Sequence, residues 1–350
     1  MKLFNRFYPG LKLKLRHHYL KRGPRIVAIG GGTGLSTLLR GLKELTSNIT
    51  AIVTVTDDGG SSGRLREDLG MSPPGDIRNC LVALAEQENI CVNLFNYRFS
   101  HGKEMSGHCL GNLLLAGLTE MSGSFAIAVQ EMSRILAVRG RVLPVTLENV
   151  VLVGEMQDGR IIKGQTEMVH DPGRIKRVFL EPDACSPLQE AIDAILSADA
   201  IIVGPGSLYT SVIPNLLVPG IREAIQKTQA KTYYICNIMT QPGETDGYQA
   251  SHHLKAILDH TDQGLIDKII VNNEIISEKL KLKYQAQGAK PVLTDEKNLG
   301  KLDIEVSSYP LCAEDNLARH DPQKILWAMT MELRQHRTCL FANTGKNPRK

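Results

Sequence analysis

Near the N-terminus, a short apolar run ends in four glycines within five residues. Residues 25–29 read Arg-Ile-Val-Ala-Ile, and residues 30–34 read Gly-Gly-Gly-Thr-Gly. Leucines at helical spacing follow, so the segment predicts a strand, a tight loop and a helix. A second apolar run at 49–55 comes after that helix. Strand, helix and strand in this order, with glycines at the strand exit, predict a parallel sheet of the doubly wound kind.

Further segments extend this α/β pattern. Apolar runs at 200–203 and 232–236 each lead into a polar loop. Residues 145–170 alternate in a β-like way around Gln157-Asp158-Gly159, which predicts a small β-hairpin insertion. We expect three parts: a basic N-terminal arm at 1–24, one α/β nucleotide-binding domain at 25–335, and a loose, polar and basic tail at 336–350.

Charge is concentrated at the N-terminus. The chain carries a net charge of +4, yet residues 1–25 hold eight Lys or Arg and no acid. The body is therefore mildly acidic, which argues against a nucleic-acid-binding surface on it. Apolar and aromatic residues interleave with the charges of the arm, and this mixture suits weak contact with anionic lipid, although a solvated tail is the simpler interpretation.

Cysteine usage and hydropathy bear on the compartment. The seven cysteines are scattered and never form a CxxC pair. This pattern predicts neither a disulfide framework nor a zinc site and favours a reducing cytoplasm. No apolar run approaches the roughly 20 residues of a transmembrane helix.

The first glycine-rich loop favours an anionic ligand. Gly31, Gly32, Thr33 and Gly34 open the predicted helix, and the absence of side chains lets backbone amides approach a phosphate. The dinucleotide fingerprint GxGxxG requires glycine where this chain has Leu35, which argues against a nicotinamide dehydrogenase. A P-loop is excluded because no Gly-Lys-Ser/Thr follows. A tight turn without a ligand is the alternative.

The second strand exit, at 57–64, carries two carboxylates, hydroxyls and an arginine. The candidate ligand-binding residues in it are Asp57, Asp58, Gly59, Gly60, Ser61, Ser62 and Arg64. A carboxylate there can accept from a sugar hydroxyl or bind Mg²⁺, and Arg64 can clamp a phosphate. An Asp-Gly turn with solvated charges is the alternative.

Two further loops precede apolar helices. Asp76, Arg78 and Asn79 stand at the start of the first helix, where Asp76 also suits a helix N-cap. His108, Gly111 and Asn112 stand at the start of the second. The histidine has no evident partner for general-base chemistry. Because no second His or Cys lies at ligand spacing, the sequence predicts no transition-metal site.

Two later loops and one charged triplet complete the candidates. Both loops are longer than ordinary βα connections and should lie at the same sheet edge as the first two. They contribute Gly204, Pro205, Gly206, Ser207 and Tyr209, and Asn237, Thr240, Gln241, Glu244, Thr245 and Asp246. Arg319, before the last helix, is a weaker candidate because its triplet suits helix capping.

These loops, in this order, resemble the gluconeogenesis factor family, which is related to the 2-phospho-L-lactate transferases. The resemblance rests on residues 28–34, 57–64, 74–79, 204–217 and 236–247, and it runs from about Arg25 to Leu333. It implies a Rossmann-like three-layer α/β/α fold with a mostly parallel sheet and a cytoplasmic protein. It also implies roles in central carbon use, cell-wall morphogenesis and cell shape, and binding of UDP-sugars such as UDP-N-acetylglucosamine.

We therefore expect a nucleotide-sugar-binding regulator that acts through an unidentified protein partner and forms a homo-oligomer. The alternative is a transferase that moves a phosphate-linked group from a nucleotide diphosphate donor with Mg²⁺ held by Asp57 or Asp58. Nothing in the residues predicts a firm cofactor, a nucleic-acid partner or a catalytic nucleophile.

Overall fold

A seven-stranded parallel sheet forms the centre of the protein. The computed structural model describes residues 18–86, 90–313 and 317–344. The strand order is β10-β9-β8-β7-β1-β2-β3, and every neighbouring pair is parallel. The strands are β1 Ile26–Gly30, β2 Ile49–Val53, β3 Arg141–Pro144, β7 Ala200–Val203, β8 Lys231–Ile235, β9 Lys268–Asn272 and β10 Glu305–Tyr309.

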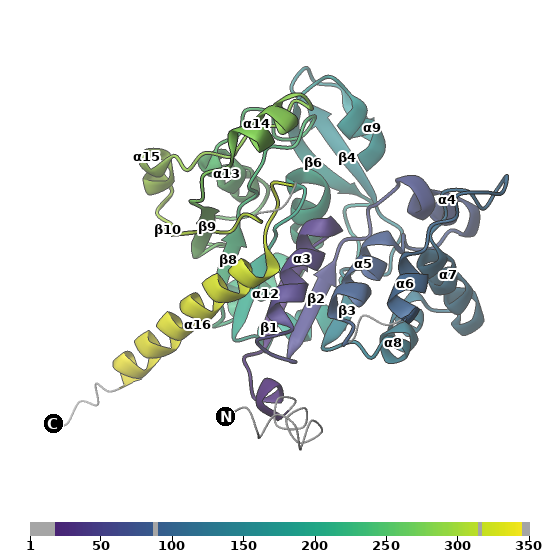
Figure 1. The fold of residues 1–350 in the computed structure, drawn as a ribbon, viewed down its shortest axis with the longest axis horizontal. Coiled ribbons are helices and arrows are strands. Elements are labelled where there is room, and N and C mark those ends of the chain that lie inside the picture. Colours follow the sequence, from purple (N-terminus) through teal and green to yellow (C-terminus); the bar gives the residue numbers. More distant parts are fainter. Residues whose placement is uncertain (1–17, 87–89, 314–316, 345–350) are drawn as a thin grey trace.

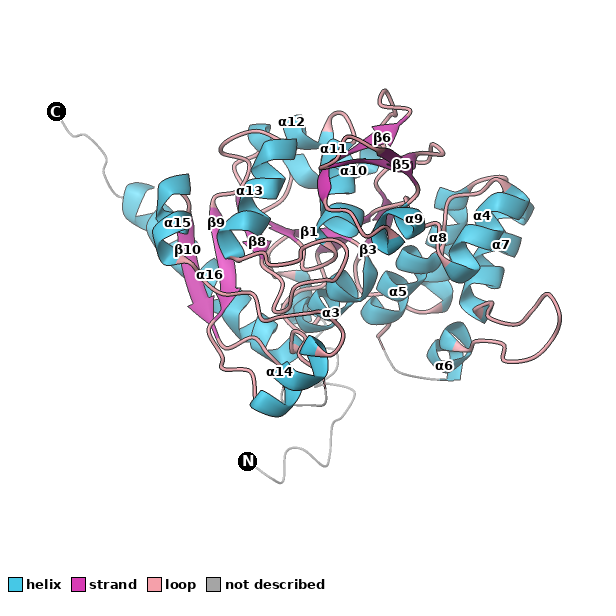
Figure 2. Ribbon diagram, turned by 90° about the horizontal axis from the view of Figure 1, so that it is seen from above, coloured by secondary structure: helices cyan, strands magenta, loops and turns pink. Residues whose placement is uncertain are grey.

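Helices cover both faces of this sheet, as Figure 2 shows from above. One face is covered by α3 Gly32–Leu42, α5 Gly75–Leu84 and α16 Pro322–Thr344, and the other by α10 Gln189–Leu196, α11 Ile213–Leu217, α12 Ile221–Lys227 and α13 Ala250–His260. The three-layer α/β/α prediction is therefore confirmed.

Side-chain alternation along the strands separates the two hydrophobic cores. On β1, Ile26 and Ala28 belong to the core under α3 and α5, whereas Val27 and Ile29 belong to the core under α11 and α12. All of β1 is buried, as expected for a central parallel strand covered on both faces. Because both faces of the sheet are covered, a ligand can reach the central strands only at their ends.

The β insertion is larger than the sequence indicates. It is an antiparallel sheet of order β5-β4-β6, built from β4 Val151–Met156, β5 Ile161–Lys163 and β6 Ile175–Glu181, with α9 Gln165–His170 between the last two. The hairpin around residues 157–159 is present. The boundary at residue 170 is wrong, because adjacent Lys176 and Arg177 interrupt the alternation that would have revealed β6.

The remaining helices lie beside these layers (Figure 1). Beyond β3 are α4 Gly60–Leu69, α6 Ile90–Asn96, α7 Leu110–Ser122 and α8 Phe125–Ile135. The π-helical turn η1 Leu208–Val212 leads into α11 and contacts β1. On the side of β8 to β10 are α14 Glu278–Gln285, α15 Glu296–Leu299 and η2 Gly300–Leu302. No helix among the described residues is long and apolar enough to cross a membrane.

Both predicted termini need correction. Helix α16 continues past residue 336 to Thr344, because no Gly or Pro interrupts the chain between Pro322 and Gly345. The loose tail predicted from residue 336 therefore begins as helix. At the other end, residues 18–21 are helical and Leu20 is buried against the body. The rest of the predicted arm, residues 1–17, lies outside the described residues.

Candidate functional site

Loops from three neighbouring strands border one cavity at the carboxyl edge of the sheet. The loops follow β1, β7 and β8, and the cavity, which we call the strand-end cavity, has a volume of about 390 Å³. This edge is where open α/β sheets bind ligands. The predicted residues that line the cavity are Gly32, Thr33, Gly34, Pro205, Gly206, Ser207, Asn237, Thr240, Gln241 and Arg319.

Glycine allows the first two loops to meet. A Cβ atom on Gly34 would collide with the Pro205 carbonyl oxygen and lie 2.7 Å from its carbon. Gly32 and Gly204 have φ values of 63° and 72°, which side chains rarely adopt. The first turn of α3 therefore packs directly on the 204–207 loop, and only glycine permits that approach.

Hydrogen bonds join the second and third loops. The Asn237 amide Nδ2 donates to the Gly206 carbonyl at 2.8 Å, and the Gly206 amide donates to Asn237 Oδ1 at 3.3 Å. The Ser207 hydroxyl donates to Gln241 Oε1 at 2.8 Å. These contacts hold the cavity wall in place before any ligand arrives.

A second cavity adjoins the first on the other side of α3. This α3–α5 cavity has a volume of about 240 Å³ and shares Thr33, Gly34, Arg319 and His320 with the strand-end cavity. Its other lining residues are mostly polar: Ser36, Thr37, Arg40, Asn79, Val82 and Asn96. The two cavities thus flank the first turn of α3, which offers backbone amides to an anion.

Several lining residues were not predicted from the sequence. Arg40 comes from the last turn of α3, whereas Tyr284 and Gln287 come from α14 and the turn after it. His320, beside the predicted Arg319, is buried and contacts the Cys236 carbonyl through Nε2 at 3.1 Å. Burial lowers the pKa of His320 to about 4, so its imidazole is neutral near pH 7. Its neighbour Asp321 caps α16, as the triplet suggested.

Two carboxylates lie behind the glycine loop. Asp76 lies in the first turn of α5, whose N-cap is Pro74, so the predicted N-cap role of Asp76 is wrong. A Cβ on Gly31 would lie 2.6 Å from Asp76 Oδ2. Burial, and then the charge of Asp57, raises the pKa of Asp76 to about 6. Burial likewise raises the pKa of Asp57, which accepts from the Gly59 amide at 3.1 Å.

Other predicted residues of the 57–64 loop turn away from both cavities. The Asp58 carboxylate accepts hydrogen bonds from the Thr166 amide and hydroxyl at 2.9 and 2.6 Å, and these bonds connect the 57–64 loop to the β insertion. Arg64 donates to the carbonyls of Glu104 and Ser106. With Gly60, these two residues line a separate depression of about 980 Å³. Ser62 lies beside Asp57, behind the glycine loop.

The candidates at 106–112 form a buried cluster of their own. The Ser61 hydroxyl lies 3.1 Å from His108 Nδ1 and accepts from Asn112 Nδ2 at 3.1 Å. Arg78 is also buried, donating to Cys109 Sγ at 2.7 Å and packing beside Gly111. This cluster joins α4, α5 and α7, and none of its residues lines either cavity.

The last four candidates form the outer layer of the cavity wall. Glu244 accepts from the Thr210 hydroxyl at 2.9 Å and from the Tyr209 amide at 3.3 Å, and burial raises its pKa to about 7. Tyr209 pairs its hydroxyl with that of Tyr248. Thr245 accepts from the Gln241 amide, and Asp246 accepts from the Gly243 amide. All four therefore position the loops and do not line the cavity.

The lining chemistry suits an anionic, hydroxyl-rich ligand. Helix amides and two arginines favour phosphate, and amide and hydroxyl side chains suit sugar or base edges. In the described part of the chain, no group of three or more His, Cys, Asp or Glu is placed to hold a metal ion. Mg²⁺ needs only one or two carboxylates beside a substrate phosphate. Asp57 and Asp76 are carboxylates behind the glycine loop, and neither lines either cavity.

Known proteins resemble this chain over most of its length. Residues 26–312 match the family described as 2-phospho-L-lactate transferase CofD. A gluconeogenesis factor of Halalkalibacterium halodurans is 54% identical over 301 residues, covering 86% of this chain and 94% of that protein. A gluconeogenesis factor of Bacillus subtilis is 52% identical over 303 residues, covering 86% and 96%.

A solved structure shows the same architecture. A crystal structure of a protein from Bacillus halodurans has a TM-score of 0.86 and 53% sequence identity, covering 88% of this chain and 100% of that chain. The resemblance noted in the motifs is thereby confirmed. The chain belongs to the family of the 2-phospho-L-lactate transferase CofD and the gluconeogenesis factors.

Proposed function

We propose that this chain is a cytoplasmic regulator that binds a nucleotide sugar of the UDP-N-acetylglucosamine type in the two adjoining cavities. The observation that carries the proposal is the convergence of the β1, β7 and β8 loops around the first turn of α3. The names of its relatives support a link to gluconeogenic growth. The proposal includes a role in cell-wall morphogenesis and cell shape, which is what the resemblance to the gluconeogenesis factor family implies.

The position of the charges suggests how the ligand lies. The diphosphate would occupy the boundary shared by both cavities, beside Thr33, Gly34 and Arg319. The nucleoside fits the larger strand-end cavity, where Tyr284 offers a ring for stacking. The sugar fits the smaller α3–α5 cavity among hydroxyl and amide groups. Asn79 remains a sugar-binding candidate, whereas Asn112 does not.

Ligand binding would act by shifting a conformational equilibrium. Arg319 and His320 lie just before α16, and Tyr284 lies in α14. A ligand that contacts these three residues would therefore link the two helices to the sheet. A partner protein that recognises the ligand-bound arrangement would then report nucleotide-sugar supply.

Isothermal titration calorimetry tests the proposal directly. We expect UDP-N-acetylglucosamine to bind, and UDP and N-acetylglucosamine each to bind more weakly because each fills one cavity. Arg319→Gln should weaken binding by about tenfold, as expected for a lost charge-assisted contact. Arg174→Gln, in an exposed turn of the insertion, is the matched control. Absence of binding at millimolar ligand would remove the proposal.

A second candidate function is transfer of a phosphate-linked group from a nucleotide diphosphate donor. The paired carboxylates of Asp57 and Asp76 behind the glycine loop favour it. They would hold Mg²⁺, which neutralises charge on the transferred phosphate. Release of nucleoside monophosphate that depends on Mg²⁺ and on an acceptor, and is lost in Asp57→Asn, would favour the transferase over the regulator.

A further inference from the structure

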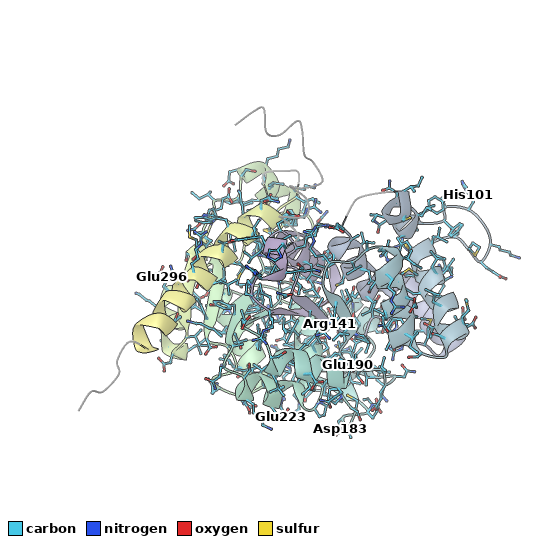
Figure 3. All side chains as sticks on the ribbon, turned by 90° about the horizontal axis from the view of Figure 1, so that it is seen from below. His101, Arg141, Asp183, Glu190, Glu223 and Glu296 are labelled. Carbon is cyan, nitrogen blue, oxygen red and sulfur yellow. The ribbon has the colours of Figure 1, made fainter. Side chains whose placement is uncertain are left out.

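We propose that the amino-terminal edge of the main sheet is a docking surface for an anionic phospholipid bilayer. The surface, which we call the basic edge face, consists of Lys21, Arg22, Arg25, Arg139 and Arg141. It lies at the end of the strands opposite the candidate ligand site, so both can be occupied at once. Figure 3 shows Arg141 near the middle of the molecule seen from below.

The chain is fixed where the arm joins this face. The Asn48 side chain donates to the Lys21 and Gly23 carbonyls at 2.9 and 2.8 Å. The Ser47 amide donates to the Leu20 carbonyl at 3.0 Å, and Leu20 is only 2% exposed. These contacts hold the backbone of residues 20–23, and therefore display Lys21 and Arg22 at a defined place on the body.

The basic side chains outnumber their acidic partners. Arg25 pairs with Asp199 at 2.9 Å, and Arg139 pairs with Glu86 at 3.2 Å. Within residues 18–86, 90–313 and 317–344, no carboxylate lies at ion-pair distance from Lys21, Arg22 or Arg141. A depression of about 620 Å³ lies among Lys21, Arg25, Arg139 and Arg141. Its size and charge complement a phospholipid headgroup.

The sequence before the face favours a bilayer over RNA as the occupant. Residues 1–17 add five basic residues and no acid, interleaved with Phe4, Phe7, Tyr8 and four leucines. Tyr19, at the edge of the face, is 76% exposed. Aromatic and apolar residues among lysines suit the headgroup boundary of a membrane, and basic clusters there bind anionic lipid. One such cluster alone anchors weakly, whereas residues 1–17 and the basic edge face together supply two.

Vesicle sedimentation with the full-length protein tests this inference. We expect binding to vesicles that contain phosphatidylglycerol, little binding to pure phosphatidylcholine, and release by salt. The variant Lys21→Gln/Arg22→Gln/Arg141→Gln should lose about fivefold in affinity for each charge removed. Lys12→Gln/Lys14→Gln/Arg16→Gln should weaken binding in the same direction.

A matched variant separates this face from net charge. Lys103→Gln/Lys255→Gln/Lys279→Gln removes three exposed lysines elsewhere and should keep the affinity of the parent protein. Equal loss in this control would overturn the inference, as would equal binding to neutral vesicles or no binding at all. Displacement from vesicles by a short single-stranded RNA that binds more tightly would identify RNA as the occupant instead and would equally overturn it.

Discussion

Asn237 and Gly206 exchange two hydrogen bonds, which join the loop after β8 to the loop after β7. We expect Asn237→Ala to lower the free energy of unfolding by about 1–3 kcal/mol, since it leaves the Gly206 amide and carbonyl without these partners. The substitution should also weaken UDP-N-acetylglucosamine binding. Without these hydrogen bonds the ligand must order the cavity wall as it binds, and that ordering costs binding free energy. Urea unfolding and calorimetry measure the two effects. An unchanged affinity would show that the two hydrogen bonds between Asn237 and Gly206 do not organise the site.

The contact of Gly34 with Pro205 gives a prediction on packing. Gly34→Ala should cost about 1–3 kcal/mol of stability and reduce ligand binding, because the new methyl group must displace the Pro205 carbonyl. Gly117→Ala, in α7, is the matched control. A Cβ there meets nothing within 4 Å, so it should raise stability by about 0.5–1 kcal/mol. Thermal unfolding of both variants checks this, and equal behaviour would contradict it.

The raised pKa of Asp76 predicts how stability changes with pH. Its pKa is about 6 in the folded protein against an ordinary value of 3.8, so the folded state binds the proton more tightly. The resulting stabilisation is complete below about pH 4 and is lost as the pH rises through about 6. We expect Asp76→Asn to flatten this part of the urea-midpoint profile. Asp321→Asn, which removes the same charge at the start of α16, should keep the slope.

The Ser61 cluster provides a test of which candidates belong to the site. Ser61→Ala should lower stability by about 1–3 kcal/mol, because Asn112 Nδ2 and the Cys109 amide lose their acceptor. The affinity for UDP-N-acetylglucosamine should stay within about twofold of the parent, since the cluster lies outside both cavities. A loss of affinity as large as that of Arg319→Gln would place the cluster in the site.

Strong local patterns account for the parts of the fold that sequence reasoning predicted. The runs at 25–29, 49–55, 200–203 and 232–236 correspond to β1, β2, β7 and β8, which are buried. Strand β10 was missed because it lies at the sheet edge, and its residues Glu305–Tyr309 are largely exposed. An edge strand has no continuous apolar run by which to recognise it.

The candidate site was predicted less completely, for a related reason. Glycine-rich strand exits drew attention to Gly34, Gly206 and their neighbours, which line the strand-end cavity. The 57–64 loop is also a glycine-rich strand exit. Its Asp58, however, forms hydrogen bonds with the β insertion, and its Arg64 forms them with the 101–107 loop. Tyr284 and Arg40 reach the cavities through helix packing, and no local motif marks them.

A crystal structure of the protein with UDP-N-acetylglucosamine would show whether the ligand occupies the two adjoining cavities. We predict the diphosphate within hydrogen-bond distance of the amides in the first turn of α3, between Thr33 and the 204–207 loop, with Arg319 beside it. A ligand bound only at the depression beside Arg64, or only at the basic edge face, would rule out the proposed binding site.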